Sequence, residues 1–134
     1  MVRTTFALLG LAGALLTGCV SDTARVHREE MQALVGRRGA LTVEVTAFNH
    51  DGDRLAEASA LEGLDLYRKQ GAVIAVFPAG SVAAFRRVRT TNHAYGRRHY
   101  VEADILAGTE IVGRGLLFGD RLLPSRSQAV TLER

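Results

Sequence analysis

Short runs of alternating apolar and polar residues fill most of the chain after residue 40, and this alternation is typical of β-strands that bury one face. The run at 41–48 is the clearest, because Leu41, Val43 and Val45 alternate there with Thr and Glu. Asp, Gly, Asn and Pro residues separate the runs about every 8–12 residues, as turns do between short strands. The pattern predicts a mainly β fold, either a small antiparallel β-sandwich or a barrel. The later strands are predicted at 64–67, 72–77, 82–91, 100–107, 110–118 and 128–132.

One segment, 54–63, is ambiguous. Its Ala, Leu and Glu residues favour a helix, whereas the hairpin signal Asp51-Gly52 before it favours a returning strand, which is our interpretation. Residues 41–88 resemble immunoglobulin-like modules of envelope lipoproteins in their asparagine-containing turn, their Leu66-Tyr67 pair and their Phe-Pro-Ala-Gly segment. The resemblance implies an immunoglobulin-like arrangement as one form of the predicted sandwich.

The first 18 residues have a different character. Arg3 gives a positive start, 6–16 is an uncharged apolar run, and Thr17-Gly18 places small residues before Cys19. This is the architecture of a cleaved secretory signal peptide, and the apolar run is shorter than the about 20 residues that a transmembrane helix needs. Leu16-Thr17-Gly18-Cys19 resembles the lipobox at which bacterial lipoproteins are acylated and cleaved. An ordinary signal peptide with an incidental cysteine, or a buried N-terminal helix, is the alternative.

The lipobox resemblance implies a lipid anchor at Cys19. In that family the Cys thiol receives diacylglycerol, the chain is cleaved before the Cys, and the new amine is acylated. Val20 stands where an Asp would favour retention in the inner membrane, which implies the periplasmic face of the outer membrane. Cys19 is the only cysteine, so acylation also removes a free thiol from an oxidising compartment. No other cofactor is expected.

A short helix is predicted between the anchor and the strands. Ser21-Asp22-Thr23 provides capping residues before 24–35, and Gly36 is a stop signal. The apolar stripe of this helix is narrow, so the helix either lies against the domain or forms a stalk above the membrane. The predicted organisation is therefore a cleaved signal peptide at 1–18, a lipidated N-terminus with its helix at 19–39, and one β-rich domain at 40–134.

Charge is segregated along the chain. Residues 66–101 contain seven basic residues and no Asp or Glu, whereas 19–65 contain five basic and nine acidic residues. In a strand over 82–90, Phe85, Arg87 and Arg89 would share the outward face. The candidate residues for binding an anion or a partner are Arg86, Arg87, Arg89, Tyr95, Arg97, Arg98 and Tyr100. Guanidinium groups bind phosphate or carboxylate bidentately. The alternative is a solvated sheet face whose charges are balanced by acidic strands beside it.

Metal ligands are too few for a site. His93 and His99 form one candidate pair, and His27 and Glu30 form another, whereas zinc sites need three or four protein ligands. The turn at 51–53 has two carboxylates but lacks the remaining ligands of a calcium loop. We therefore expect no metal site.

Catalytic groupings are equally sparse. No serine lies in a nucleophile elbow, and no phosphate-binding loop occurs. Glu102, Asp104 and Glu110 form the one set of carboxylates that a fold could bring together as in glycoside hydrolases. Strand alternation already explains Glu102 and Asp104 as an outer face, so we expect a protein that is not an enzyme.

These observations lead to three functional hypotheses. The first is a lipoprotein of the outer membrane that acts as a binding or accessory subunit of an envelope or secretion assembly, with another envelope protein as its partner. The alternative is a binder of anionic cell-wall glycan, such as peptidoglycan, or of anionic lipid through the arginine-rich hairpin. The third is a small envelope hydrolase. Nucleic acid is not an expected partner, because an exported lipid-anchored protein rarely meets it.

Overall fold

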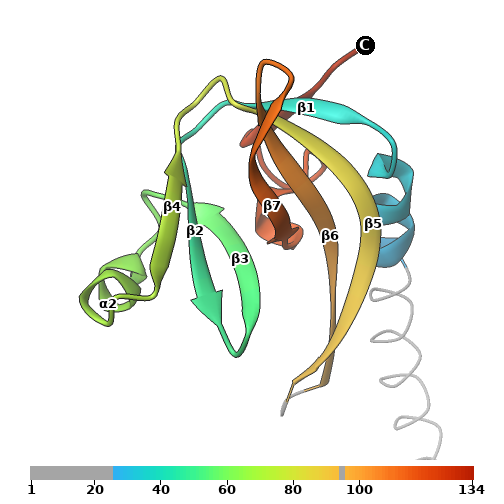
Figure 1. Ribbon diagram of the computed structural model, residues 1–134. Helices are drawn as coiled ribbons and strands as arrows, with labels where there is room; N and C mark the ends of the chain where they lie inside the picture. Colours follow the sequence, from blue (N-terminus) through green and yellow to red (C-terminus); the bar gives the residue numbers. More distant parts are fainter. Residues whose placement is uncertain (1–25, 94–95) are drawn as a thin grey trace, which may run out of the picture.

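The computed structural model describes residues 26–93 and 96–134 (Figure 1). Helix α1 covers residues 26–34, α2 covers Leu64–Lys69, and the 3-10 helix η1 covers Asp120–Leu122. The strands are β1 (Arg38–Leu41), β2 (Val45–His50), β3 (Asp53–Ala58), β4 (Val73–Phe77), β5 (Val82–His93), β6 (Gly96–Ala107), β7 (Glu110–Phe118) and β8 (Val130–Leu132). The signal peptide, Cys19 and Tyr95 lie outside the described residues.

The strands form one eight-stranded sheet in the order β4-β2-β3-β7-β6-β5-β1-β8. Neighbouring strands are antiparallel except β3 and β7, which run parallel with Leu55 opposite Leu117. The prediction of a mainly β fold after a short helix is confirmed, and the sheet is not closed into a barrel. An immunoglobulin-like sandwich divides its strands between two sheets, whereas all eight strands here belong to one.

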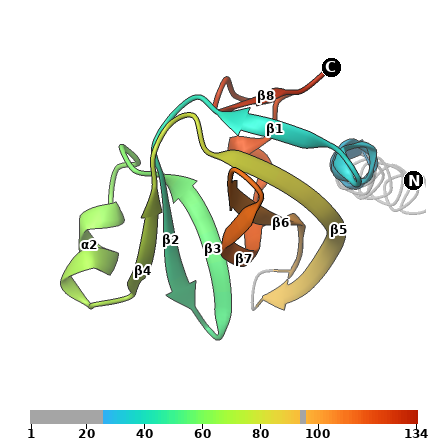
Figure 2. The same cartoon turned by 45° about the horizontal axis from the view of Figure 1, so that its top comes forward.

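Two hairpins give the sheet its bent shape. The β2–β3 hairpin turns at Asp51 and Gly52, whose φ angles of 50° and 83° are the left-handed values that a tight hairpin requires. The β5–β6 hairpin is longer, with twelve residues in each strand. Figure 2 shows these hairpins on two sides of the bend with β7 between them. The ambiguous segment 54–63 begins as strand β3, in agreement with our interpretation, and turns after Ala58.

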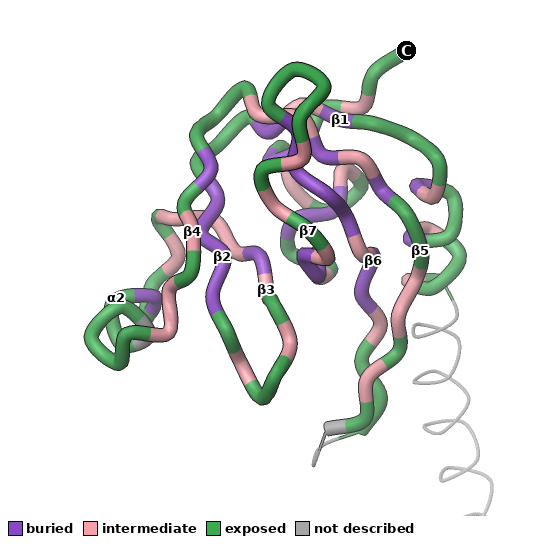
Figure 3. The backbone as a smooth tube through the Cα atoms, viewed as in Figure 1, coloured by how far each residue is buried: buried purple, intermediate pink, exposed green. Residues whose placement is uncertain are grey.

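One core joins α1, η1 and the eight strands. The purple segments of Figure 3 mark buried residues on β2, β6, β7 and α1, among others. Met31 and Leu34 of α1 belong to this core, and the Gly36 N–H donates to the Phe85 carbonyl at 2.9 Å just after the helix. Ser125 Oγ also donates to Glu30 Oε2 at 3.0 Å. Helix α1 therefore lies against the domain, and of the two arrangements expected for it the stalk does not form.

The prediction of a strand at 64–67 is wrong, because helix α2 forms there. Gly63 before it has a φ of 85°, a left-handed value, and lies in the turn that leads into the helix. Asp65 lies in the first turn and pairs with Arg68 at 3.6 Å, an i, i+3 contact that the helix provides and an extended strand does not. Leu64 is buried while Leu66 is exposed, so these two leucines do not share one face as they would in a strand.

The expected outward position of Phe85 is also wrong. Phe85 is 3% exposed and meets Phe118 edge-on, with ring centroids 5.8 Å apart. The register of β5 against β6 shifts between Phe85 and Arg87, so that Arg86 is an extra residue in β5. This bulge breaks the alternation on which the prediction relied. Arg87 and Arg89 keep their places away from the core, whereas Ala83 and Phe85 face it.

Candidate functional site

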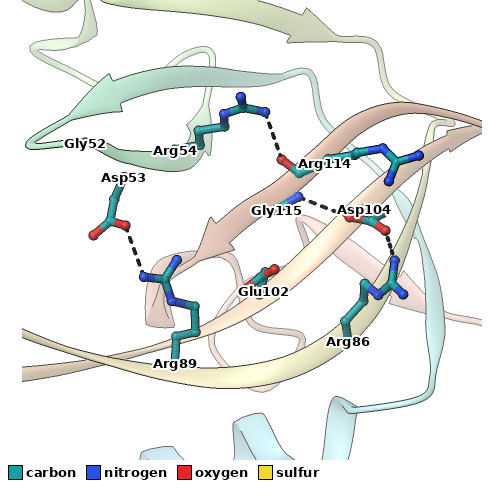
Figure 4. A pocket seen from close by; sticks show the side chains of 9 residues that line it. All are labelled: Gly52, Asp53, Arg54, Arg86, Arg89, Glu102, Asp104, Arg114 and Gly115. Atoms are coloured by element: carbon teal, nitrogen blue, oxygen red, sulfur yellow. Dashed lines mark hydrogen bonds and ion pairs between the residues drawn. The ribbon is translucent and has the colours of Figure 1, made fainter.

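Two concave sites bring candidate side chains of the described residues together. The first, which we call the polar cleft, has a volume of about 390 Å³ and lies between the β2–β3 hairpin and strands β5, β6 and β7 (Figure 4). It is lined by Gly52, Asp53, Arg54, Arg86, Arg89, Glu102, Asp104, Arg114 and Gly115. The second, which we call the groove, has a volume of about 960 Å³ and extends from α1 to the loop before α2. Both volumes suit a small ligand or part of a larger one.

Ion pairs order the polar cleft. Arg86 pairs with Asp104, and Arg87 Nε donates to Glu102 Oε2 at 2.8 Å across neighbouring strands. Arg89 Nη2 reaches Asp53 Oδ1 at 3.3 Å, which links the two hairpins. Acidic residues beside them therefore balance the charges of these three arginines. This is the arrangement expected for a solvated sheet face, which was the alternative to an anion-binding surface.

Asp104 is the most constrained charge in the cleft. It is 4% exposed, and its Oδ1 accepts the Gly115 N–H at 3.1 Å, where Gly115 has a φ of 62° and the register of β6 against β7 is interrupted. Burial alone would raise the pKa of Asp104. Hydrogen bonds from Arg86 and Gly115, with the charges of Arg86 and Arg114, outweigh it and lower the pKa. Asp104 is therefore an anion at neutral pH.

This electrostatic arrangement bears on the carboxylate set considered from sequence. Glu102 and Asp104 both line the polar cleft, whereas Glu110 does not. A glycoside hydrolase needs one carboxyl group with a raised pKa as proton donor. Asp104 has a lowered pKa and Glu102 is ion-paired, so neither has the environment of such a donor.

Two further arginines, Arg54 and Arg114, line the cleft and were not predicted from the sequence. Within the described residues, no carboxylate lies at ion-pair distance from Arg54 or Arg114. Arg54 Nη1 donates to the Arg114 carbonyl at 3.4 Å and so connects β3 with β7. No motif marked either residue, since they become neighbours only through the parallel pairing of these strands.

The groove has an apolar floor and charged walls. Met31, Phe48, Leu55 and Leu117 are among its apolar residues, and Leu66 of α2 stands at its edge with 60% of its surface exposed. His27 comes from α1 and two arginines come from β6, whereas acidic residues come from the β2–β3 hairpin and the loop before α2, and η1 contributes one residue of each sign. The charged and histidine residues that line it are His27, His50, Asp51, Glu57, Glu62, Arg97, Arg98, His99, Asp120 and Arg121.

Two groups in the groove have shifted pKa values. Burial raises the pKa of Glu57, the charge of Arg121 partly offsets this, and Asp120 adds to the rise. Burial also lowers the pKa of His99, with further lowering by the charges of Arg28, Arg97 and His27. His99 is thus neutral at pH 7, and its Nδ1 lies 2.9 Å from Thr90 Oγ1.

The predicted site residues divide between the two sites. Arg86 and Arg89 line the polar cleft, and Arg87 pairs with Glu102 beside it. Arg97, Arg98 and the largely buried Tyr100 line the groove. The sequence segment 66–101 therefore does not form one basic surface.

The candidate metal ligands are used otherwise. His27 Nε2 is hydrogen-bonded to Arg126, and Glu30 accepts the Ser125 hydroxyl, so both hold α1 to the loop before β8. Among the residues that the structure describes, no three His, Cys, Asp or Glu side chains are grouped as metal ligands.

Comparisons with protein-family models, with curated proteins and with solved structures find no match to this chain. Within residues 26–93 and 96–134, no helix is long and apolar enough to cross a membrane.

Proposed function

We propose that this chain is a lipid-anchored envelope protein that binds a polypeptide segment of another envelope protein in the groove. The groove carries the proposal. Its apolar floor offers contact area for side chains, and its basic and acidic walls select a segment by charge and fix its direction. The lipobox residues Leu16-Thr17-Gly18-Cys19 supply the anchor and the cellular location.

The polar cleft supports a binding protein more than an enzyme. Its carboxylates are engaged with arginines, and the pKa of Asp104 is lowered, which is the environment of a structural ion-pair network rather than of a proton donor. Arg89 and Asp53 hold the two hairpins at a set distance, and the groove lies along the same hairpins. The network thus favours a pre-shaped groove.

The alternative function is binding of anionic glycan or lipid through one arginine-rich surface. Three arginines of that predicted surface already form ion pairs. Arg86, Arg87 and Arg89 are engaged with carboxylates. Arg97 and Arg98 have no carboxylate at ion-pair distance among the described residues. Of the predicted arginine-rich surface, only the hairpin end would therefore meet an anionic ligand.

The anchor is tested by replacing Cys19. We expect the wild-type chain to be recovered from outer membranes with a mass that shows cleavage before Cys19 and added acyl chains. Cys19→Ala should leave an uncleaved precursor without lipid, because the thiol that accepts diacylglycerol is absent. A Cys19→Ala chain that is still cleaved at the same bond and still sediments with outer membranes contradicts the anchor.

The groove is tested by placing a charge on its exposed apolar edge. Leu66→Asp puts a carboxylate at the groove, whereas Val112→Asp makes the same kind of change on β7 at a similar exposure of 48% outside it. One envelope protein should co-purify in a fixed ratio with the wild type and with Val112→Asp, and its recovery should fall with Leu66→Asp. Equal recovery with both variants contradicts binding in the groove.

A further inference from the structure

A basic cluster lies where α1 begins. We define it as His27 and Arg28 of α1 with Arg97, Arg98 and His99 of β6. His27 lines the groove together with the three residues of β6, and the charges of Arg28 and His27 act on His99. In Figure 1 α1 lies beside β5, the described part of α1 begins at its lower end, and the β5–β6 hairpin extends downward past that level. Two segments about 70 residues apart in sequence thus contribute to one cluster whose positive charge comes from Arg28, Arg97 and Arg98, with His27 and His99 between them.

The arginines of this cluster have no ion-pair partner among the described residues. No carboxylate of the described chain lies within ion-pair distance of Arg28, Arg97 or Arg98. By contrast, Arg86, Arg87 and Arg89, farther along the same hairpin, each have a carboxylate partner. Positive charge is therefore concentrated at the hairpin end and at the start of α1, where it is available to an external anion.

The length of chain before α1 places this cluster near the anchor. Cys19 precedes Val26 by seven residues, which span at most about 25 Å when fully extended. Helix α1 cannot add to this reach, because Met31 and Leu34 pack in the core and Gly36 is hydrogen-bonded to Phe85. An acylated Cys19 in a bilayer therefore keeps the start of α1, and the basic cluster with it, close to the lipid headgroups. Tethering of this kind makes even weak contacts effective.

We infer that the basic cluster docks on an anionic phospholipid surface beside the lipid anchor and so holds the groove at the membrane. The inference rests on the acylation of Cys19 in the proposed function. Each arginine near an anionic leaflet strengthens association roughly fivefold, so Arg97 and Arg98 together contribute on the order of 25-fold to the docked population. Because Arg97 and Arg98 also line the groove, docking turns that wall toward the bilayer. The segment that the groove binds then lies next to the membrane.

The test uses the mature acylated protein reconstituted into vesicles. Since the one native cysteine is acylated in that form, a second cysteine introduced at Asn92, exposed beside the hairpin tip, carries a fluorophore uniquely. Glu110, the first residue of β7 and opposite Ala107 at the other end of β6, is the control position. The fluorophore at position 92 should be quenched by brominated lipid in vesicles that contain phosphatidylglycerol, and much less in pure phosphatidylcholine. The fluorophore at position 110 should be quenched in neither.

Charge reversal separates docking from simple anchoring. Arg97→Glu with Arg98→Glu should abolish the quenching at position 92, and so should high salt, which screens the attraction. Arg68→Glu with Lys69→Glu makes the same change of charge on α2 and should leave the quenching intact. If the protein floats with the vesicles but quenching at position 92 is equal in both lipids, or survives reversal of Arg97 and Arg98, docking is overturned and the anchor is not. A protein that carries no acyl chain and does not float contradicts the anchor itself, and docking with it.

Discussion

Replacement of Asp104 by Asn tests whether the polar cleft stabilises the fold in the way its geometry indicates. Asp104 accepts hydrogen bonds from Arg86 and from the Gly115 N–H, and its side chain is nearly inaccessible. Asn keeps the shape but has one acceptor oxygen and no charge, so one of the two bonds is lost. A hydrogen bond to a charged group contributes about 1.5–3 kcal/mol to stability. Arg86 is 57% exposed and can bond to water instead, so we expect a loss of about 1–2 kcal/mol.

The assay is urea unfolding of residues 20–134 followed by far-ultraviolet circular dichroism, since the chain has no Trp. A denaturant slope of about 1–2 kcal/mol per molar predicts that the Asp104→Asn midpoint falls by roughly 1 M at pH 7. Glu102→Gln is the matched control on the same strand. Its partner Arg87 is mostly exposed, so this change should cost no more than about 0.5 kcal/mol.

The pH dependence supplies a second readout. Because the pKa of Asp104 is lowered in the folded state, its contribution to stability is complete above the unfolded value of about 3.9. The contribution is lost as pH falls through the folded pKa. The stability of the wild type should therefore approach that of Asp104→Asn at low pH. An unchanged midpoint at pH 7, or a difference between the two proteins that persists below the folded pKa, refutes this explanation of the cleft.

Two further changes test the packing of the sheet and the groove. A Cβ at Gly113 would lie 2.5 Å from Phe77 Cζ, so Gly113→Ala should lower the free energy of unfolding by about 1–3 kcal/mol. Gly119→Ala is the control and should be tolerated, because the nearest contact of its Cβ is Tyr100 Cε1 at 3.5 Å. Equal urea midpoints for the two variants would show that the Phe77 ring moves aside without cost. Glu57→Gln should raise the urea midpoint at pH 7, because a group with a raised folded pKa loses stability as pH rises through that pKa. The gain should vanish below about pH 4.3, the unfolded value, and a gain that is the same at both pH values contradicts the burial of Glu57 as its cause.

Strand positions could be predicted from the sequence because burial of one face imposes a period of two, and the hairpin at Asp51-Gly52 because its left-handed angles need those residue types. The bulge at Arg86 could not, since it arises from the register of β5 against β6 and leaves no local signal. Helix α2 was missed for a related reason. The apolar residues in 64–67 fit either a strand or a helix, and the left-handed turn at Gly63 leads the chain into the helix.

The candidate site was predictable only in parts. The excess of arginine in 66–101 was visible, but its neutralisation by Asp53, Glu102 and Asp104 depends on which strands become neighbours. Arg54 and Arg114 meet across the single parallel pair of the sheet, which no short-range pattern indicates. The groove is likewise assembled from α1, the two hairpins and the loops around α2 and η1, so its apolar floor could not be recognised along the chain.

Short-range photo-crosslinking in intact cells tests the central claim most directly. A photoreactive residue at Leu66 stands at the exposed edge of the groove, and one at Val112 stands on β7 outside it. We predict that position 66 captures one envelope protein, through a defined segment of its chain, and that position 112 does not. Capture of no protein from position 66, or the same capture from both positions, contradicts a groove that binds a partner.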